Sequence, residues 1–508
     1  MANSLNRIED EKVEGGLATV VTTGVAWIGG SQLIIQLLRF LATAVLARLL
    51  LPSDFGVVGM AVIVTGLVTM VCELGLSAAM VQREELKESH LVTSLWTSLT
   101  TGVVLCLATI ALSHPIALFF GEAIVRPVVA TLSFSFILSS MSTVQRALLQ
   151  KRMQFKQLAF SQIGGELAFG AVGISLALRG LGVWALVVGI LSRHLVQSLL
   201  LWLLCPWRPS GPFHWRSFRE LFSFGANVLG GQLLNFLGAN LDYLIVGRIL
   251  GATPLGYYTL AFELTMFPRA RIASMMTRVA FPAFSAIQRD NSRLRKGYTT
   301  MIAYLSLATF PLVVGLFAVA PEFILVIFGT RWTPVILPLQ VLCMGGLMAS
   351  IGTTVGSILK AKGRPDLELK MNLLSVTLLG LAIGIGVRHG IVGVAAAVSL
   401  KTLFLAWLFA WITNSLIGLG FMEYLRALQP ASIAVAAMLL FLLGYRALAS
   451  PLLSNTALLL SSIPLGAIVY FGTLKGMRAK AMEELIRLLW GTVGSPVLAL
   501  ARRLTLSK

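Results

Sequence analysis

The chain has 508 residues, of which 57% are hydrophobic and only 12% are charged. Soluble globular proteins carry roughly 25% charged residues, so this composition excludes a soluble enzyme or binding module and indicates an integral membrane protein. The formal net charge of +19 does not indicate a nucleic-acid partner, because the Lys and Arg residues punctuate apolar runs instead of gathering in a patch with aromatic residues.

The chain begins with a polar, acidic stretch, 1–17, which we expect to be a cytoplasmic tail and not a cleaved signal peptide. Fourteen apolar segments follow, each close to the roughly 20 helical residues that a bilayer core requires. These predicted spans are 18–41, 57–79, 91–113, 123–144, 157–178, 181–204, 224–247, 256–279, 299–320, 334–358, 369–387, 391–416, 429–448 and 455–474. The last stretch, 476–508, is basic and amphipathic, and we expect it to lie on the inner leaflet.

The basic residues alternate along the chain as a fourteen-helix topology requires. Of the 40 Lys and Arg residues, 30 are assigned to the side of the N-terminus, seven to the opposite side and three to neither side. Loops rich in Lys and Arg stay in the cytoplasm, so both termini are predicted to be cytoplasmic.

A weak internal repeat relates residue n to residue n+200. Without a gap, it pairs Gln32 with Gln232, Arg48 with Arg248, and Gly56 with Gly256. We interpret 18–215 and 216–420 as two six-helix lobes, with 421–475 as two extra helices. Because six is an even number, both lobes enter the membrane from the same side and would be related by a pseudo-two-fold axis along the membrane normal. The predicted fold is an all-α polytopic membrane protein with a central cavity between its lobes.

Polar side chains follow one face of the first and of the seventh predicted helix. These residues are Gln32, Gln36, Arg39 and Thr43 on the first helix, and Gln232, Asn235 and Asp242 on the seventh. A charge facing lipid at mid-depth costs at least roughly 2.5–3.5 kcal/mol, which favours a position facing the cavity for Arg39 and Asp242. For Gln32 and Gln232, a role in the cavity and hydrogen bonding between helices stay equally open.

Four stretches carry a resemblance to a known family. They are LARLLLPSDFGVVGMAVIVTGLVTMVCELGLSAAMVQREEL at 46–86, QRALLQKRMQF at 145–155, NLDYLIVGRILGATPLGYYTLA at 240–261 and FPAFSAIQRD at 281–290. Over roughly residues 20–420, the chain resembles the bacterial Wzx-type oligosaccharide flippases of the polysaccharide-synthase family. These flippases belong to the superfamily that includes the multidrug and toxic-compound extrusion (MATE) transporters.

The resemblance implies an alternating-access exporter in a bacterial inner membrane. Its cargo would be a polyprenyl-pyrophosphate-linked oligosaccharide, moved to the periplasmic leaflet for the synthesis of exopolysaccharide, capsule or lipopolysaccharide O-antigen. We expect membrane lipids and a polysaccharide polymerase or co-polymerase as further partners. We expect no cofactor, although some members of the family couple transport to a gradient of H+ or Na+.

Three cations are assigned to neither side and remain inside predicted spans: Arg39, Arg193 and Lys401. The Arg guanidinium presents donors in a fork that matches phosphate oxygens, so all three are candidate ligands of the pyrophosphate. Ion pairs are the alternative, between Arg39 and Glu73 or Asp242, and between Arg193 and Glu166. The candidate sugar ligands are the amides Gln32, Gln36, Gln232, Asn235 and Asn240.

Three arginines near predicted cytoplasmic helix ends, Arg146, Arg269 and Arg271, are candidate entrance residues, although snorkelling or binding of lipid head groups is the favoured interpretation.

Carboxylates in a low-dielectric site can carry a proton, so acids within the spans are candidates for ion coupling. Asp242 is the first choice, Glu263 the second, and Glu73 is included; a role as counter-ion to an arginine stays open for each. The chain has no P-loop and no cluster of histidines, and its four cysteines lack metal-ligand spacing. We therefore expect no ATP hydrolysis, no metal site and no disulfide.

Three alternatives stand beside the glycan flippase. A drug or cation antiporter of the same fold would need an acid-rich cavity with few cations, whereas the spans here contain Arg39, Arg193 and Lys401. A flippase for the peptidoglycan lipid precursor would carry a similar cargo. A membrane-bound glycan polymerase or ligase typically has a large periplasmic loop, and the predicted outside connections are short, so we expect no enzyme.

Overall fold

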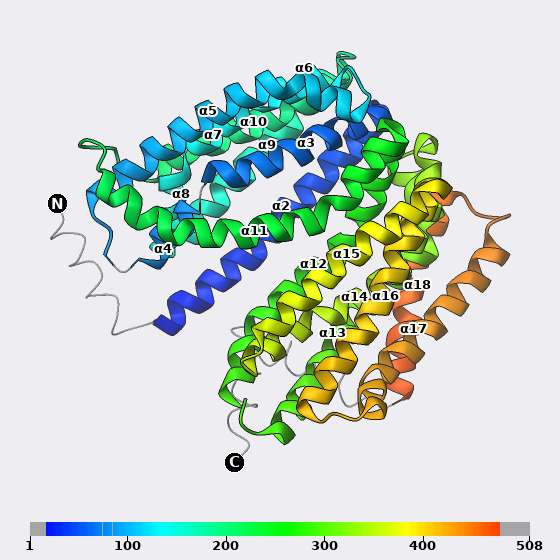
Figure 1. Ribbon diagram of the computed structural model, residues 1–508. Helices are drawn as coiled ribbons and strands as arrows, with labels where there is room; N and C mark the ends of the chain where they lie inside the picture. Colours follow the sequence, from blue (N-terminus) through cyan, green and yellow to red (C-terminus); the bar gives the residue numbers. More distant parts are fainter. Residues whose placement is uncertain (1–16, 74, 84, 478–508) are drawn as a thin grey trace. The chain divides into compact units, whose positions relative to one another are not determined.

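The computed structural model describes residues 17–73, 75–83 and 85–477, and within these ranges it describes all side chains except those of 17–29, 223–229, 231, 234–235 and 267–279. In these residues all regular secondary structure is helical (Figure 1), which confirms the all-α prediction. The tails predicted at 1–17 and 476–508 lie, apart from their innermost residues, outside the described residues.

The chain divides into two compact units. Unit 1 contains the described residues up to 240 together with 251–253, and unit 2 contains 241–250 and the described residues from 254 onward. The helices of unit 1 are α2 (Leu17–Leu49), α3 (Pro52–Glu73), α4 (Leu76–Gln82), α5 (Glu88–Phe120), α6 (Val125–Leu132), α7 (Phe134–Ser140), α8 (Thr143–Lys151), α9 (Phe155–Leu178), α10 (Val183–Leu204) and the larger part of α11 (Trp215–Leu250).

Unit 2 is also helical, and the division between the units falls inside α11. Its further elements are α12 (Ala252–Ala286) except its first two residues, α13 (Asn291–Ile327), the short 3-10 helix η1 (Thr330–Val335), α14 (Ile336–Ala361), α15 (Pro365–Gly386), the 3-10 helix η2 (Val387–His389), α16 (Gly390–Ile417), α17 (Phe421–Ala449) and α18 (Asn455–Gly476).

Two predicted spans differ from the observed helices. The segment predicted at 57–79 is helix α3 followed by α4, because Gly75 takes a left-handed conformation (φ 66°) between them. The segment predicted at 123–144 is divided among α6, α7 and α8, with a bend of 44° between Val125–Ser140 and Thr143–Lys151. At the two breaks, Ser133 and Ser142 donate hydrogen bonds to backbone carbonyls three residues earlier.

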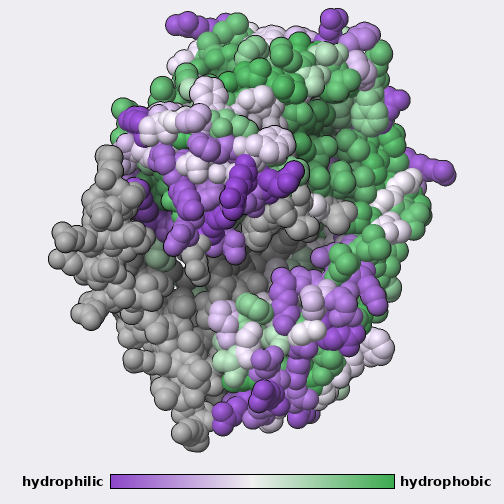
Figure 2. All heavy atoms as spheres, turned by 60° about the vertical axis from the view of Figure 1, so that its left-hand side comes forward, coloured by the Kyte–Doolittle hydropathy of each residue, from purple (hydrophilic) through white to green (hydrophobic). Residues whose placement is uncertain are grey.

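Every predicted span overlaps a helix, and much of the helical surface is apolar. Within the described residues, ten helical stretches are long and apolar enough to cross a membrane, or eleven if the bent pair forms one span. The number of fourteen therefore stays a prediction. Large apolar side chains such as Leu203 (76% exposed) and Leu448 (78% exposed) point away from the protein. Figure 2 shows apolar side chains over wide areas of one face, as expected of a surface that meets lipid.

The same pairs of helices pack together in each unit. In unit 1, α5 packs against α6 and α7, α7 against α10, and α9 against α10. In unit 2, α13 packs against α14, α14 against α16, and α15 against α16. Counted within each predicted repeat, the third helix packs against the fourth, the fourth against the sixth, and the fifth against the sixth. The packing inside each unit therefore agrees with the repeat in the sequence. The extra helices α17 and α18 pack against each other and against α13.

All four cysteines of the chain, Cys72, Cys106, Cys205 and Cys343, are buried and free, as predicted.

Glu220 links the first turns of α11 to the start of α5. Its carboxylate accepts hydrogen bonds from Arg83 Nη2 (2.6 Å) and Arg216 Nε (3.2 Å), and His90 Nε2 lies 3.3 Å away. The Arg83 guanidinium is the main reason that the pKa of Glu220 is lowered, followed by the hydrogen bond with His90. The connection from α10 follows the same path, since Trp207 Nε1 donates to Glu88 at the start of α5.

Candidate functional site

Three charged side chains meet inside unit 1, one each from α2, α9 and α10. Arg39 Nη2 donates to Glu166 Oε1 at 2.5 Å, and Arg193 Nη2 lies 3.3 Å from Glu166 Oε2. Glu166 is only 4% exposed, whereas the side chains of Arg39 and Arg193 are 47% and 23% exposed. Two guanidinium groups thus share one buried carboxylate, which leaves the cluster with one excess positive charge, and its accessible member is Arg39.

Local sequence places these groups close together. Gly165 precedes Glu166, and a Cβ at this position would lie 3.1 Å from the Arg193 carbonyl oxygen, so the absence of a side chain allows α9 and α10 to approach closely. The Arg193 guanidinium lies over the Phe169 ring, 4.3 Å from its centroid, which supports the cation on one face. The α9–α10 turn contains Gly180 and Gly182 with φ of 76° and 54°, values that glycine adopts without strain.

An amide pair continues this polar face toward the N-terminal part of α2. Gln32 Nε2 donates to Gln162 Oε1 at 3.2 Å, and Gln36 lies between Gln32 and Arg39 on the same helical face. Gln32 and Gln36 are both partly exposed. The predicted polar stripe of α2 therefore faces α9, and a hydrogen bond between helices is one of the two roles that the sequence left open for Gln32.

The ion-pair partners differ from the prediction for one arginine and agree for the other. The predicted pair between Arg193 and Glu166 is confirmed. Within unit 1, Arg39 pairs with Glu166 and not with Glu73, the alternative given from the sequence, because Glu73 lies 3.4 Å from Arg146. The packing of α2 along α9, which spacing within one helix cannot reveal, brings Glu166 to Arg39.

The pair of Arg146 and Glu73 links a candidate entrance residue to a candidate coupling residue. The Arg146 and Glu73 side chains are 31% and 38% exposed, so water screens the pair. Of these two acids of unit 1, Glu166 is buried more deeply than Glu73.

A second polar cluster lies inside unit 2, around Asp242 of α11. Its carboxylate is 3% exposed and accepts hydrogen bonds from the Tyr258 hydroxyl (2.8 Å) and from the backbone N–H of Tyr243 (3.0 Å). The Tyr243 and Tyr258 rings pack edge to face, with centroids 5.6 Å apart. Lys401 of α16 lies within electrostatic range of Asp242. A buried acid near a cation can change its protonation state when that cation binds another group.

The remaining predicted residues are less buried. Glu263 is exposed and lies within electrostatic range of Tyr243. Gln232 is exposed, and the Asn240 side chain donates to the Phe236 carbonyl of its own helix (2.8 Å). The side chains of Asn235, Arg269 and Arg271 lie outside the described residues, so their predicted roles stay predictions.

Sequence reasoning omitted three residues that complete these clusters: Gln162, Phe169 and Tyr258. Their sequence signals were weak, since an aromatic residue in an apolar helix predicts core packing. The i, i+4 spacing of Gln162 and Glu166 on α9 was the available signal, because it repeats the spacing of Gln32 and Gln36.

The match to known proteins extends over most of the chain. Residues 45–337 match the family described as "Polysaccharide biosynthesis protein". The chain belongs to this family. One member, the "Lipopolysaccharide biosynthesis protein WzxC" of Escherichia coli (strain K12), is 30% identical over 370 residues, which are 72% of this chain and 74% of WzxC. The "Teichuronic acid biosynthesis protein TuaB" of Bacillus subtilis (strain 168) is 30% identical over 416 residues, which are 80% of this chain and 83% of TuaB.

This member of the polysaccharide biosynthesis protein family also shares its fold with a solved structure. The "Lipid II flippase MurJ, inward closed conformation" superposes with a TM-score of 0.70 over 90% of this chain and 99% of MurJ, at 15% sequence identity. At that identity the likeness shows the fold alone. The family resemblance predicted from the four sequence stretches is confirmed.

Proposed function

We propose that this protein is a flippase that carries polyprenyl-pyrophosphate-linked oligosaccharide repeat units across a bacterial inner membrane by alternating access. Its relatives are named for the biosynthesis of lipopolysaccharide and teichuronic acid, two surface glycans. The cargo would enter from the cytoplasmic leaflet, and both termini would be cytoplasmic, as the distribution of Lys and Arg predicts. A polysaccharide polymerase or co-polymerase would take up the product, and the protein would catalyse no reaction of its own.

The observation that carries this proposal is the arrangement of Arg39, Glu166 and Arg193. Glu166 and Phe169 orient the guanidinium groups, and one positive charge remains in excess. Arg39, half exposed, can turn further N–H donors toward a phosphate oxygen while one nitrogen stays on Glu166. The partly exposed Gln32 and Gln36 on the same face of α2 would bind the hydroxyl groups of the first sugar.

Unit 2 would supply the coupling step. Asp242 is buried, bound by Tyr258 and close to Lys401. Uptake of a proton would remove the negative charge of Asp242 and so change the electrostatic balance between Asp242 and Lys401. The n+200 repeat places Ala239 opposite Arg39 and Ala42 opposite Asp242. Each half therefore has a charged group that the other half lacks: a cation for the cargo in one, and an acid for H+ or Na+ in the other.

Two alternatives differ in the cargo. A drug or cation antiporter is disfavoured, because the most accessible charge in the unit 1 cluster is the cation Arg39. A flippase for the peptidoglycan precursor would use the same pyrophosphate chemistry, and only an assay of the cargo separates it from a glycan flippase.

The test uses a strain that lacks this protein and is complemented with wild type, Arg39→Ala or Arg179→Ala. Arg179 is an exposed arginine at the end of α9 and controls for removal of a cation from the same helical hairpin. Lipid extracts report the polyprenyl-pyrophosphate oligosaccharide held on the cytoplasmic leaflet, and surface polysaccharide is measured in parallel. We expect the intermediate to accumulate in the deletion strain and with Arg39→Ala, but not with Arg179→Ala. A deletion strain that keeps its surface polysaccharide, accumulates no intermediate and loses dye efflux would refute the proposal in favour of the antiporter.

A further inference from the structure

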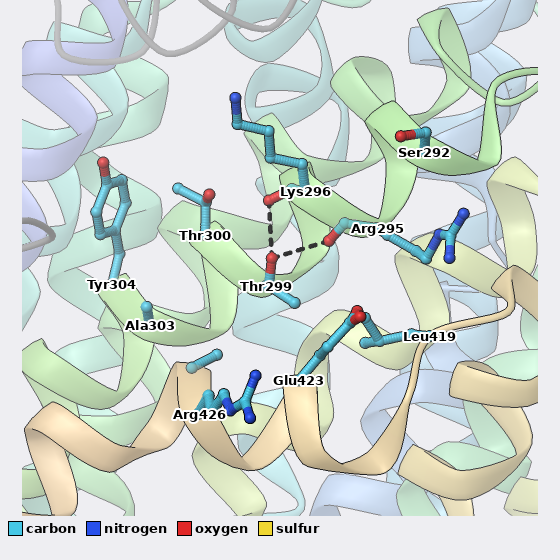
Figure 3. A pocket seen from close by; sticks show the side chains of 11 residues that line it. Ser292, Arg295, Lys296, Thr299, Thr300, Ala303, Tyr304, Leu419, Glu423 and Arg426 are labelled. Atoms are coloured by element: carbon cyan, nitrogen blue, oxygen red, sulfur yellow. Dashed lines mark hydrogen bonds between the residues drawn. The ribbon is translucent and has the colours of Figure 1, made fainter.

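A basic cavity of about 660 Å³ opens in unit 2 where α13 and α17 begin. It is lined by the first turns of α13, by Leu419 of the α16–α17 connection and by the first turns of α17. Its polar lining includes Ser292, Arg295, Lys296, Thr299, Glu423 and Arg426. Figure 3 shows the side chains of Glu423 and Arg426, from α17, pointing toward α13. The site is separate from the Asp242 cluster, since none of its lining residues belongs to that cluster.

The charges in this cavity favour an anion. Three cations, Arg295, Lys296 and Arg426, line it together with one carboxylate, Glu423. Arg295 is held in place by bonds to the backbone, since its Nη1 donates to the Gly418 carbonyl (3.0 Å) and its Nε to the Asn291 carbonyl (3.3 Å). Among the described residues, no ion pair engages Lys296 or Arg426, both of which are exposed. Their charges are therefore available to a ligand.

Hydroxyl groups lie beside these cations. The Thr299 hydroxyl donates to the carbonyls of Arg295 (3.0 Å) and Lys296 (3.1 Å), which leaves its oxygen lone pairs as acceptors (Figure 3). Ser292 and Thr300 also line the cavity. A ligand that carries both a phosphate and free hydroxyl groups would satisfy the cations and the acceptors together.

Apolar groups at the same end of unit 2 indicate that the ligand is a lipid. Ala303, Leu419 and Ala427 form the apolar part of the cavity lining. Phe421 and Met422, at the start of α17, are 54% and 60% exposed, and the Phe421 ring packs against Trp407. Exposed aromatic residues beside basic ones are typical of the membrane–water interface, where lipid head groups lie. This end of unit 2 is also the end that the Lys and Arg distribution assigns to the cytoplasm.

We propose that the cavity binds the head group of an anionic glycerophospholipid, with phosphatidylglycerol as the representative ligand. Its phosphate would lie between Arg295, Lys296 and Arg426, and its glycerol hydroxyls would donate to Thr299 and Glu423. Basic pockets between helices on the cytoplasmic side of membrane proteins bind such head groups. The bound lipid would join α13, a helix of the six-helix repeat, to α17, one of the extra helices.

The test measures phosphatidylglycerol bound to the purified full-length protein by native mass spectrometry, over a titration of the lipid. The variant Lys296→Gln/Arg426→Gln removes two charges from the cavity and keeps the backbone bonds of Arg295. The control Arg289→Gln/Arg293→Gln removes two charges from the same end of unit 2; neither residue lines the cavity, and Arg293 pairs with Asp290. Since each basic residue near an anionic lipid contributes roughly fivefold, we expect roughly 30-fold weaker binding for the cavity variant. The control should change the affinity less than about twofold.

Two further arms identify the ligand. The conservative variant Arg426→Lys should keep most of the affinity, and phosphatidylcholine, whose head group has no net charge, should bind no better to wild type than to the cavity variant. Equal losses in the cavity variant and the control would overturn the proposal, because the attraction would then come from the whole surface. Displacement of phosphatidylglycerol by glycerol 3-phosphate or inorganic phosphate at equal concentration would also overturn it, since the site would then take a soluble phosphate.

Discussion

Removing the Arg39 side chain has two effects, and a second substitution separates them. Arg39→Ala deletes a candidate ligand of the pyrophosphate, but it also takes one cation from Glu166, which is only 4% exposed. If Arg39 serves only to neutralise this carboxylate, Glu166→Gln should make Arg39 dispensable. If Arg39 binds the cargo, Glu166→Gln should not compensate for its loss, because an amide supplies no positive charge.

The structure sets the size of each effect. Arg39 is 47% exposed, and Arg193, 3.3 Å from Glu166, remains as a second cation for this carboxylate, so we expect Arg39→Ala to destabilise the protein by only about 1 kcal/mol. A charged hydrogen bond to phosphate contributes about 1.5–3 kcal/mol, which corresponds to roughly 10- to 150-fold in affinity. Cargo transport by Arg39→Ala should therefore fall by at least about tenfold, which the expected loss of stability does not explain.

The assay is transfer of a polyprenyl-pyrophosphate-linked oligosaccharide between the leaflets of proteoliposomes that contain equal amounts of each purified variant. Glu166→Gln alone should keep most of the activity, and Arg39→Ala/Glu166→Gln should remain as low as Arg39→Ala. The double variant measures the interaction between the two residues directly. Recovery of the double variant to within about twofold of Glu166→Gln would refute the ligand role, and Arg39 would then be a structural counter-ion.

Three further predictions test the remaining parts of the structure. Asp242→Asn should abolish the response of transport to a pH gradient in proteoliposomes, while Tyr258→Phe, which leaves the carboxylate in place, should keep it; an unchanged response in Asp242→Asn would exclude Asp242 as the coupling acid. Gly165→Val should destabilise the protein by about 1–3 kcal/mol in thermal unfolding, because the new side chain meets the backbone and side chain of Arg193; a stability equal to wild type would show that α9 and α10 need no close approach here. The pKa of Glu220 is lowered in the folded protein, so the stabilisation from this carboxylate is present above its unfolded pKa and is lost as the pH falls through the folded pKa. The difference in melting temperature between wild type and Glu220→Gln should therefore be largest near neutral pH and vanish in acid, and a difference that does not change with pH would contradict this contribution.

Hydropathy and charge were sufficient to predict the helical segments, because lipid requires each span to satisfy its own backbone. The prediction was less accurate where local chemistry interrupts a helix. Gly75 ends the second span by adopting a left-handed conformation, and the fourth span is divided at Ser133 and near Ser142. Neither feature lowers the mean hydropathy of the segment enough to interrupt the apolar run, so a search for apolar runs does not detect it.

The sequence predicted which residues share a face of one helix, but of the contacts between helices it predicted the pair of Arg193 and Glu166 and not that of Arg39 and Glu166. Periodicity placed Gln32, Gln36 and Arg39 on one face of α2, and the structure keeps them there. The partner of Arg39 on the neighbouring helix could not be predicted in this way. Glu166 is 127 residues from Arg39 along the chain, and periodicity within one helix carries no information over that separation. A buried acid in a span requires a cation, so Glu166 was a recognisable candidate, but Arg193 alone would have satisfied that requirement.

The internal repeat distinguishes residues that recur in both halves from charged residues that occur in only one half. Gly56 recurs as Gly256, and at Gly56 a Cβ would overlap the carbonyl group of Ala252, so this position is small because of close packing. Arg39 and Asp242 do not recur, since alanine occupies both equivalent positions. A two-fold arrangement of identical charges would bind two equivalent ligands, one in each half, whereas export of a single cargo coupled to an ion needs two different sites. The positions where the repeat fails are therefore those where a function in transport is expected, and Arg39 and Asp242 are the two charged residues that meet this criterion in the predicted spans that begin each half, 18–41 and 224–247.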